Sequence, residues 1–182
     1  SNSTNLGTAL VKDSTGNIGV TGTAYNGSYI EIHSILYDST GTQLWVNILP
    51  TGLNFMDANP KIATDTIANH FYISGQIQKA TTDVLCYQIT PIGGITSWSV
   101  IIDGAANGTD ASTNLLVNGV GQVYLSAHCK NISANYDYTT IKLSQTPTYT
   151  IPNAPSSTDV QSQNWIYYEN KGQVLKTGTT SV

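Results

Sequence analysis

The chain has 182 residues, of which only 10% are charged, and its formal net charge is -4 at pH 7. With so few cationic side chains it has no basic face to neutralise phosphates, so we expect no nucleic-acid partner. No apolar run approaches the roughly 20 residues that cross a bilayer as a helix, so we also expect no membrane insertion.

The first predicted element is a β-hairpin over residues 5–22, and the stretch that closes it returns along the chain. Copies of this stretch end at Gly22, Gly75, Ala127 and Gly178, spaced about 50 residues apart, within the range typical of repeat architectures. The sequence therefore predicts a repeated structural unit rather than one irregular domain.

Two apolar columns precede the end of each copy and are separated by one residue. The columns are Ile18, Phe71, Val123 and Val174, followed by Val20, Ile73, Leu125 and Lys176. A spacing of two indicates a β-strand, because successive side chains leave opposite faces of the sheet. The intervening residues are also mostly apolar or aromatic, so we expect both faces of this strand to be covered. Lys176 is the one exception in the columns.

The turn before this strand also repeats. Asp13 to Gly16, Asn118 to Gly121 and Glu169 to Gly172 each place an acid or amide three residues before a glycine, and the Asp65 to Asn69 turn is one residue longer. Such side chains bond the backbone ahead of them, and glycine or asparagine takes the positive φ that closes a hairpin. The alternative is a calcium loop, which needs several convergent oxygens. One acid per turn favours the hairpin, and we expect no metal.

A second hairpin follows the first in each unit, over residues 31–45, 83–98 and 137–149. Each begins with an acidic residue and carries an aromatic residue late in its closing strand, which we interpret as a packing anchor. The acids are Glu31, Asp83 and Asp137, and the aromatic residues are Trp45, Trp98 and Tyr149. Two hairpins make four strands, the content of one propeller blade.

The predicted fold is all-β. It is a β-propeller-like repeat of four-stranded antiparallel blades, with about 3.5 blades present, open or a fragment of a larger propeller. The whole chain, 1–182, is one repeat domain with approximate units 5–56, 57–109 and 110–158 and a half unit 159–182. An uncovered blade would expose apolar surface, so we expect a neighbouring chain or missing blades to cover the open side.

The motif pattern resembles the bacterial β-propeller repeat often called the SBBP repeat. The pattern is an acidic start, an apolar strand, Asp-x-x-Gly-Asn, a strand ending in Thr-Gly, and then an acid-led strand and a tryptophan. The matching residues are Asp13, Gly16, Asn17, Thr21, Gly22, Gly41 and Trp45 in the first unit, and Asp137, Tyr138, Thr140, Ile141 and Lys142 in the third. The resemblance implies a secreted or cell-surface bacterial protein whose propeller binds or scaffolds. It implies no active site.

No sequence motif for catalysis or for a cofactor is present, and His33, His70 and His128 fall on different parts of the repeat. We therefore predict a protein that is not an enzyme and uses no cofactor. The strongest catalytic alternative is a carboxylate pair for glycoside hydrolysis, drawn from the acids Asp57, Asp110 and Asp159 that open successive units. Their repetition argues against it, because catalysis needs one site rather than one acid per unit.

The loops between the two hairpins differ in length, and loops of uneven length on an even scaffold often carry specificity. The candidate ligand-binding residues are Tyr25, Asn26, Tyr29, Asn131 and Tyr136, together with Asp57, Asp110 and Asp159. We predict an extracellular or cell-surface, non-catalytic binding or scaffolding module with a protein or glycan ligand, in an adhesive or glycan-binding role. One alternative is an accessory propeller of a secreted hydrolase, and another is that these loops merely connect strands.

Cys86 and Cys129 lie in different kinds of strand in different units and show no zinc-site spacing. We expect both to be free buried thiols. A disulfide between them is the alternative for an exported chain, with demanding geometry.

Overall fold

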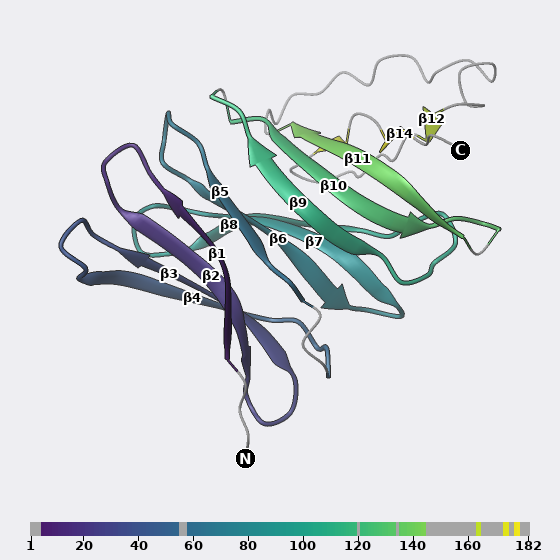
Figure 1. Ribbon diagram of the computed structural model, residues 1–182, viewed down its shortest axis with the longest axis horizontal. Coiled ribbons are helices and arrows are strands. Elements are labelled where there is room, and N and C mark those ends of the chain that lie inside the picture. Colours follow the sequence, from purple (N-terminus) through teal and green to yellow (C-terminus); the bar gives the residue numbers. More distant parts are fainter. Residues whose placement is uncertain are drawn as a thin grey trace.

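The computed structural model describes residues 5–54, 58–119, 121–133, 135–144, 163–164, 173–174 and 177–178. In this part of the chain every regular element is a β-strand (Figure 1), so the all-β prediction is confirmed. The same residues include no helix long and apolar enough to cross a membrane.

Two complete four-stranded antiparallel sheets follow each other along the chain, as the repeat predicts. Sheet 1 consists of β1 (Leu6–Lys12), β2 (Ile18–Tyr25), β3 (Ile30–Tyr37) and β4 (Gln43–Pro50). Sheet 2 consists of β5 (Lys61–Thr64), β6 (Phe71–Gln78), β7 (Thr82–Ile89) and β8 (Thr96–Ile102). In both sheets the order in space is the order in sequence.

Sheet 3 has the same start and a different fourth strand. It contains β9 (Ala111–Val117), β10 (Val123–Lys130), β11 (Tyr136–Ser144) and then β13 (Gln173–Val174), which pairs with β11. Residues 173–174, which the sequence places in the half unit 159–182, thus form the edge of sheet 3. The closing strand expected near Tyr149 lies outside the described residues.

Two further short strands pair with each other in the fourth unit. They are β12 (Gln163–Asn164) and β14 (Thr177–Gly178), with Gln163 opposite Gly178. In sheet 1 the corresponding pair is Gly7 opposite Gly22. One pair of the first hairpin thus recurs, whereas the next pairs differ, since Asn164 is opposite Thr177 and Ala9 rather than Thr8 is opposite Thr21.

The predicted hairpin turns are confirmed at Asp13, Asp65 and Asn118. Asp13 Oδ1 accepts the N–H groups of Thr15 and Asn17 at 2.9 and 2.8 Å. Asp65 Oδ1 accepts the N–H of Ala68 at 2.7 Å, and Asn118 Oδ1 accepts that of Gln122. The closing residues Gly16, Asn69 and Gly121 take the positive φ that such turns require.

The three sheets lie in chain order, each packed on the next (Figure 1). One apolar core between sheets 1 and 2 includes Ile32, Phe71 and Tyr87, and another between sheets 2 and 3 includes Val84 and Leu125. Sheet 2 is therefore buried on both faces, as expected, whereas sheets 1 and 3 are each covered by a neighbouring sheet on one face. In the described part of the chain the sheets do not close into a ring.

The aromatic residues of the closing strands pack as anchors. The Trp45 side chain is only 6% exposed, lies edge-on to Phe71 with ring centroids 5.7 Å apart, and donates its indole N–H to the carbonyl of Pro91. Trp98 packs against the second core, beside Tyr72. The packing interpretation is confirmed for both tryptophans.

Cys86 and Cys129 are both free and both buried in the core between sheets 2 and 3, as predicted. Burial raises the pKa of the Cys86 thiol and raises that of Cys129 to about 12. Neither is therefore a reactive thiolate at neutral pH.

Candidate functional site

The outer face of sheet 3 is unlike any other face of the stack. We call it the tyrosine face and define it by alternate residues of β10 and β11, which point away from sheet 2. These residues are Tyr124, Ser126, His128 and Lys130, opposite Lys142, Thr140, Tyr138 and Tyr136 respectively. Aromatic rings, hydroxyls and cationic groups thus alternate over two neighbouring strands.

The two tyrosines at the β11 start are the most exposed rings of this face. Tyr136 is 56% exposed and Tyr138 is 60% exposed, although both lie within a regular strand. Tyr136 packs edge-on against His128 with ring centroids 5.4 Å apart, and the hydroxyl of Thr140 donates to that of Tyr138 at 3.2 Å. These contacts support the rings while leaving much of their surface open to solvent.

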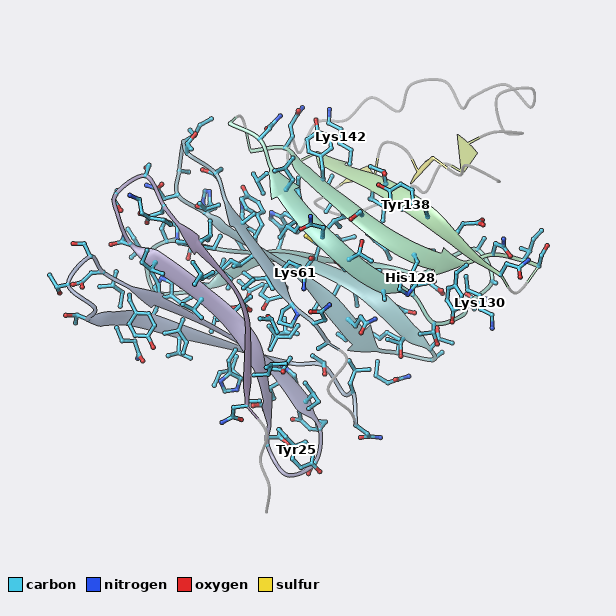
Figure 2. All side chains as sticks on the ribbon, viewed as in Figure 1. Tyr25, Lys61, His128, Lys130, Tyr138 and Lys142 are labelled. Carbon is cyan, nitrogen blue, oxygen red and sulfur yellow. The ribbon has the colours of Figure 1, made fainter. Side chains whose placement is uncertain are left out.

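The tyrosine face also carries the ammonium group of Lys142 and a shallow hollow. The ammonium of Lys142 lies 5.5 Å from the ring centroid of Tyr124, within cation–π range. A hollow of about 150 Å³ lies beside this pair, lined by Leu116, Tyr124 and Thr140 among others. Figure 2 shows His128, Lys130, Tyr138 and Lys142 on sheet 3, far from Tyr25.

The register explains why only sheet 3 has such a face. The position of Tyr138 is taken by Ile32 in sheet 1 and by Val84 in sheet 2, as the pairing of Thr21 with Ser34, Ser74 with Cys86 and Ser126 with Thr140 shows. Ile32 and Val84 are fully buried against the next sheet. The change from aliphatic residues to tyrosine at this position is the signal in the sequence that points to Tyr138, which was not among the predicted site residues; Tyr136 was.

The predicted loop residues of the first unit have structural partners of their own. Asn26 Oδ1 accepts the N–H groups of Ser28 and Tyr29, and its amide donates to Glu31 at 2.7 Å. The Tyr25 hydroxyl donates to the carbonyl of Gly27 at 2.9 Å. This loop is therefore closed by its own polar groups.

Asn131 repeats this arrangement in the third unit. Its side-chain oxygen accepts the N–H groups of Ser133 and Asn135, and its amide donates to Asp137 at 3.1 Å. Its polar groups are engaged in closing the turn, while Tyr136 belongs to the tyrosine face. The predicted loop residues thus belong to sheets 1 and 3, with sheet 2 between them, and the structure does not bring them together.

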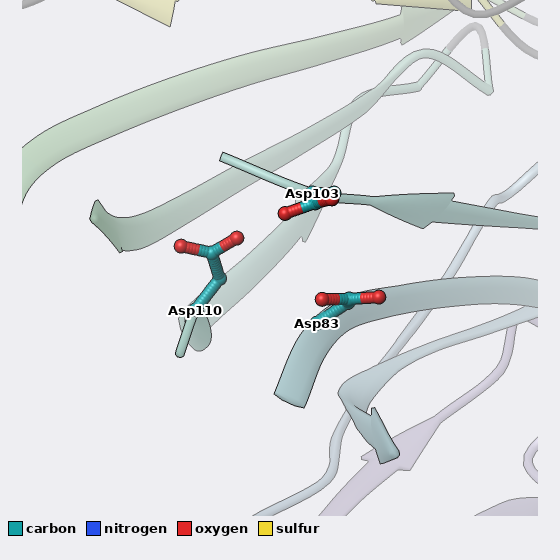
Figure 3. A group of neighbouring side chains, drawn as sticks. All are labelled: Asp83, Asp103 and Asp110. Atoms are coloured by element: carbon teal, nitrogen blue, oxygen red, sulfur yellow. The ribbon is translucent and has the colours of Figure 1, made fainter. Parts of the chain in front are cut away.

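Of the three acids predicted to open successive units, the structure describes only Asp110, since Asp57 and Asp159 lie outside the described residues. Asp110 is fully buried and lies beside Asp83 and Asp103, and the carboxylate oxygens of these residues are within 4.8 Å of one another (Figure 3). We call these three residues the carboxylate cluster. No spacing in the sequence predicts this cluster, because it joins β7, the end of β8 and the start of β9.

Backbone groups hold Asp110 in this cluster. Its carboxylate accepts the N–H of Lys130 at 2.8 Å and the N–H of Gly104, and its own N–H donates to the carbonyl of Thr82 at 2.7 Å. Asp83 accepts the hydroxyl of Thr81 at 3.0 Å. Carboxylate oxygens are ligands that Ca²⁺ and Mg²⁺ take, so these are the described residues suited to a divalent cation. The expectation of no metal stays a prediction.

Burial and like charge act together on the carboxylate cluster. Burial raises the pKa of Asp83 and of Asp110, and the neighbouring Asp103 carboxylate raises both further, against the lowering effect of their hydrogen bonds. An acid with a raised pKa in the folded state destabilises the fold fully above that pKa, and this penalty fades as the pH falls from that pKa to the ordinary pKa of aspartate. The cluster therefore makes the fold less stable at neutral than at acidic pH.

We expect Asp83→Asn to stabilise the fold at pH 7 by roughly 0.2–1 kcal/mol, because it removes one like charge from a closely spaced set. The gain should disappear below the ordinary pKa of an aspartate, where the carboxyl of the parent protein is protonated as well. Urea unfolding from pH 3.5 to 7.5 measures this, with Asp38→Asn at a surface turn as the control. An equal gain at both ends of the pH range would contradict it.

The three histidines lie in β3, in the β5–β6 turn and in β10, and have separate neighbours. His33 lies 3.1 Å from Glu31, His70 lies 3.3 Å from Asp65, and His128 packs on Tyr136. They do not converge on one ligand position.

No protein-family model matches the chain, and no curated protein matches it either. The resemblance to the bacterial β-propeller repeat therefore rests on the motif residues alone and remains a prediction.

Proposed function

We propose that this chain is a non-catalytic binding module whose tyrosine face holds an acidic carbohydrate. The observation that carries the proposal is the pair of exposed rings, Tyr136 and Tyr138, of which Tyr138 stands where sheets 1 and 2 have the buried aliphatic residues Ile32 and Val84. Exposed tyrosine combines an apolar ring with a hydroxyl and loses little rotamer entropy on binding, which suits a recognition surface.

The charges of the face indicate the class of carbohydrate. Lys130, Lys142 and the edge of His128 lie on this face, and none of its eight defining residues is acidic. The chain as a whole carries a net charge of -4, so this is a locally cationic surface on an acidic protein. A saccharide with carboxylate or sulfate groups would pair with the lysines while its apolar ring faces stack on the tyrosines.

The finer fold and location are also part of the proposal. We propose a propeller-like arrangement of the three sheets, supported by the contacts of β1 with β5 and of β5 with β9, which set the first strands of successive sheets side by side. We propose an extracellular or surface location, supported by the low charge and the motif resemblance. A scaffolding or adhesive role fits a module that presents one ligand face.

Binding of an acidic polysaccharide such as a polyuronate, measured by calorimetry or on a glycan array, tests the proposal. We expect Tyr138→Ala to weaken binding at least about tenfold, as for the central residues of interfaces, and added salt to weaken it further. Tyr29→Ala, in the loop of sheet 1, is the matched control and should leave binding unchanged.

Three results would contradict the proposal. One is binding that survives Tyr138→Ala and is lost with Tyr29→Ala, because that would place the site on the sheet 1 loop. Another is equal binding of a single-stranded oligonucleotide of matched charge, because the face would then recognise charge alone. The third is no binding to any acidic glycan.

A further inference from the structure

The hollow on the tyrosine face is formed by a short side chain among longer ones. Ser126 of β10 lies between its strand partners, Asn114 on β9 and Thr140 on β11. Leu116 and Tyr124, which are partners of each other, stand two residues further along β9 and β10. A serine flanked by a leucine and a tyrosine ring leaves a depression, because its side chain ends well below theirs.

The walls of the hollow are of two kinds. Leu116, which is 65% exposed, and the ring of Tyr124 form an apolar wall. The amide of Asn114 and the hydroxyls of Ser126 and Thr140 can each donate and accept a hydrogen bond. None of the described residues that line the hollow is charged. The hollow therefore suits a neutral group with one apolar end and one hydrogen-bonding end.

Ser126 belongs to the hydroxyl column that precedes the end of each repeat. In sheet 2 the residue of this column is Ser74, which is fully buried and accepts the hydroxyl of Ser112 from sheet 3 at 2.9 Å. The column thus bonds a polar group of the layer that covers it. The Ser126 hydroxyl shares a hydrogen bond with Thr113 at 2.8 Å and keeps further capacity, since a hydroxyl has one donor and two acceptor positions.

A cation stands at the rim of the hollow. Lys142 is the β11 partner of Tyr124, and its ammonium lies 5.5 Å from the centroid of the ring that forms part of the apolar wall. A carboxylate paired with Lys142 is therefore close to whatever group enters the hollow. Two such groups fit one ligand if they are carried by the same sugar or by neighbouring sugars.

Size and chemistry narrow the choice of occupant. The hollow has about 150 Å³, below the roughly 300–1,000 Å³ of pockets that enclose a whole small molecule, so it takes a substituent. A sulfate or a second carboxylate would lose water against Leu116 without a cation in the wall. A lone hydroxyl would leave the apolar wall unfilled. An acetamido group offers a methyl to the apolar wall and an amide N–H and carbonyl to the polar groups.

We propose that the hollow is the specificity pocket for an acetamido group, so that the ligand of the tyrosine face is a carbohydrate with N-acetylated amino sugars beside its carboxylates. This inference rests on the proposed carbohydrate function. The sugar rings stack on Tyr136 and Tyr138, a carboxylate pairs with Lys142, and the neighbouring acetamido group fills the hollow. A polysaccharide in which uronate and N-acetylhexosamine alternate carries both groups on adjacent sugars.

Calorimetry of the full chain with two oligosaccharides tests the proposal. The probes are a hyaluronan fragment, in which glucuronate alternates with N-acetylglucosamine, and an oligogalacturonate with the same number of carboxylates and no acetamido group. We expect the hyaluronan fragment to bind about tenfold more tightly, at the low end of the roughly 10–200-fold that one fitted methylene gives in an apolar pocket. Equal charge on the two probes removes electrostatics as the cause.

Two variants place the preference in the hollow. Ser126→Leu fills it, and Leu116→Asn removes part of the apolar wall at a position that is 65% exposed, where the fold does not depend on the side chain. Each should lower the affinity for the hyaluronan fragment to that for the oligogalacturonate, which should itself stay unchanged. Ser133→Leu, the same change in the exposed β10–β11 turn, is the control. Far-ultraviolet circular dichroism checks that each variant is folded.

Failure of this inference and failure of the proposed function give different results. Equal binding of the two probes, or a preference that persists in folded Ser126→Leu and Leu116→Asn, would overturn the acetamido pocket and leave the carbohydrate function standing. No binding of either probe would overturn both. Loss of the preference in Tyr138→Ala but in neither hollow variant would place the acetamido group elsewhere and overturn the pocket.

Discussion

Phe71→Ala should lower the free energy of unfolding by about 3–5 kcal/mol, the usual cost of emptying a buried phenylalanine site. The ring is fully buried between sheets 1 and 2 and lies edge-on to Trp45. A Cβ at Gly19 would be 2.8 Å from its Cε1 atom, so the ring packs directly on the bare backbone of β2. Rigid sheet backbones on both sides cannot collapse into the cavity.

Urea unfolding followed by tryptophan fluorescence measures this loss. Ile67→Ala, which shortens a 70% exposed isoleucine in the β5–β6 turn, is the control and should change stability by less than about 0.5 kcal/mol. The stability loss of Phe71→Leu should lie between those of Phe71→Ala and Ile67→Ala. A loss from Phe71→Ala no larger than that of the control would mean that sheets 1 and 2 do not pack as described.

Asp110→Ala should lower the free energy of unfolding by about 2–4 kcal/mol, because it leaves one buried and one partly buried backbone donor without an acceptor. The carboxylate joins the N–H of Gly104, beyond β8, to the N–H of Lys130, at the end of β10. The Asp110 N–H and carbonyl are bonded as well, to Thr82 and to the amide of Gln76 at 3.4 Å. This one residue therefore ties the connection between sheets 2 and 3 to both of them.

Two further variants distinguish the effect of losing the Asp110 hydrogen bonds from the effect of losing its charge. Asp110→Asn keeps one acceptor oxygen and relieves repulsion within the carboxylate cluster, so we expect a smaller loss than for Asp110→Ala. Asp38→Ala removes a similar set of bonds to Thr40 and Thr42 in an exposed turn, and water replaces them there, so the loss should again be smaller. If Asp38→Ala and Asp110→Ala lose the same stability in thermal unfolding, the hydrogen bonds of Asp110 do not hold sheets 2 and 3 together as described.

The local structure followed from short-range patterns. The alternation around Ile18 and Val20 predicted a strand, and Asp13 and Gly16 predicted its turn, because strand period and turn closure depend on residues within a few positions of one another. The same reasoning placed Trp45 and Trp98 as anchors. The all-β class and the four strands per unit follow from these local rules repeated along the chain.

The candidate sites depend on contacts between residues that are far apart in the sequence. Asn26 and Asn131 looked like loop ligand residues, yet each closes its own turn by the same rule that predicted the turn at Asp13. Asp83 and Asp110 meet only because the chain returns beside β7 after leaving β8. Such meetings are set by how sheets stack, which spacing in the sequence does not encode.

By itself the sequence determined the strands, the turns and the repeat, since each is fixed by neighbouring residues and by hydrogen bonds along a hairpin. Only the tertiary structure decided which face of each sheet is buried. Val20 and Leu125 occupy one column of the repeat, but Leu125 lies against sheet 2 and Val20 faces away from the stack. Burial depends on whether another sheet lies within van der Waals contact, and no single strand carries that information.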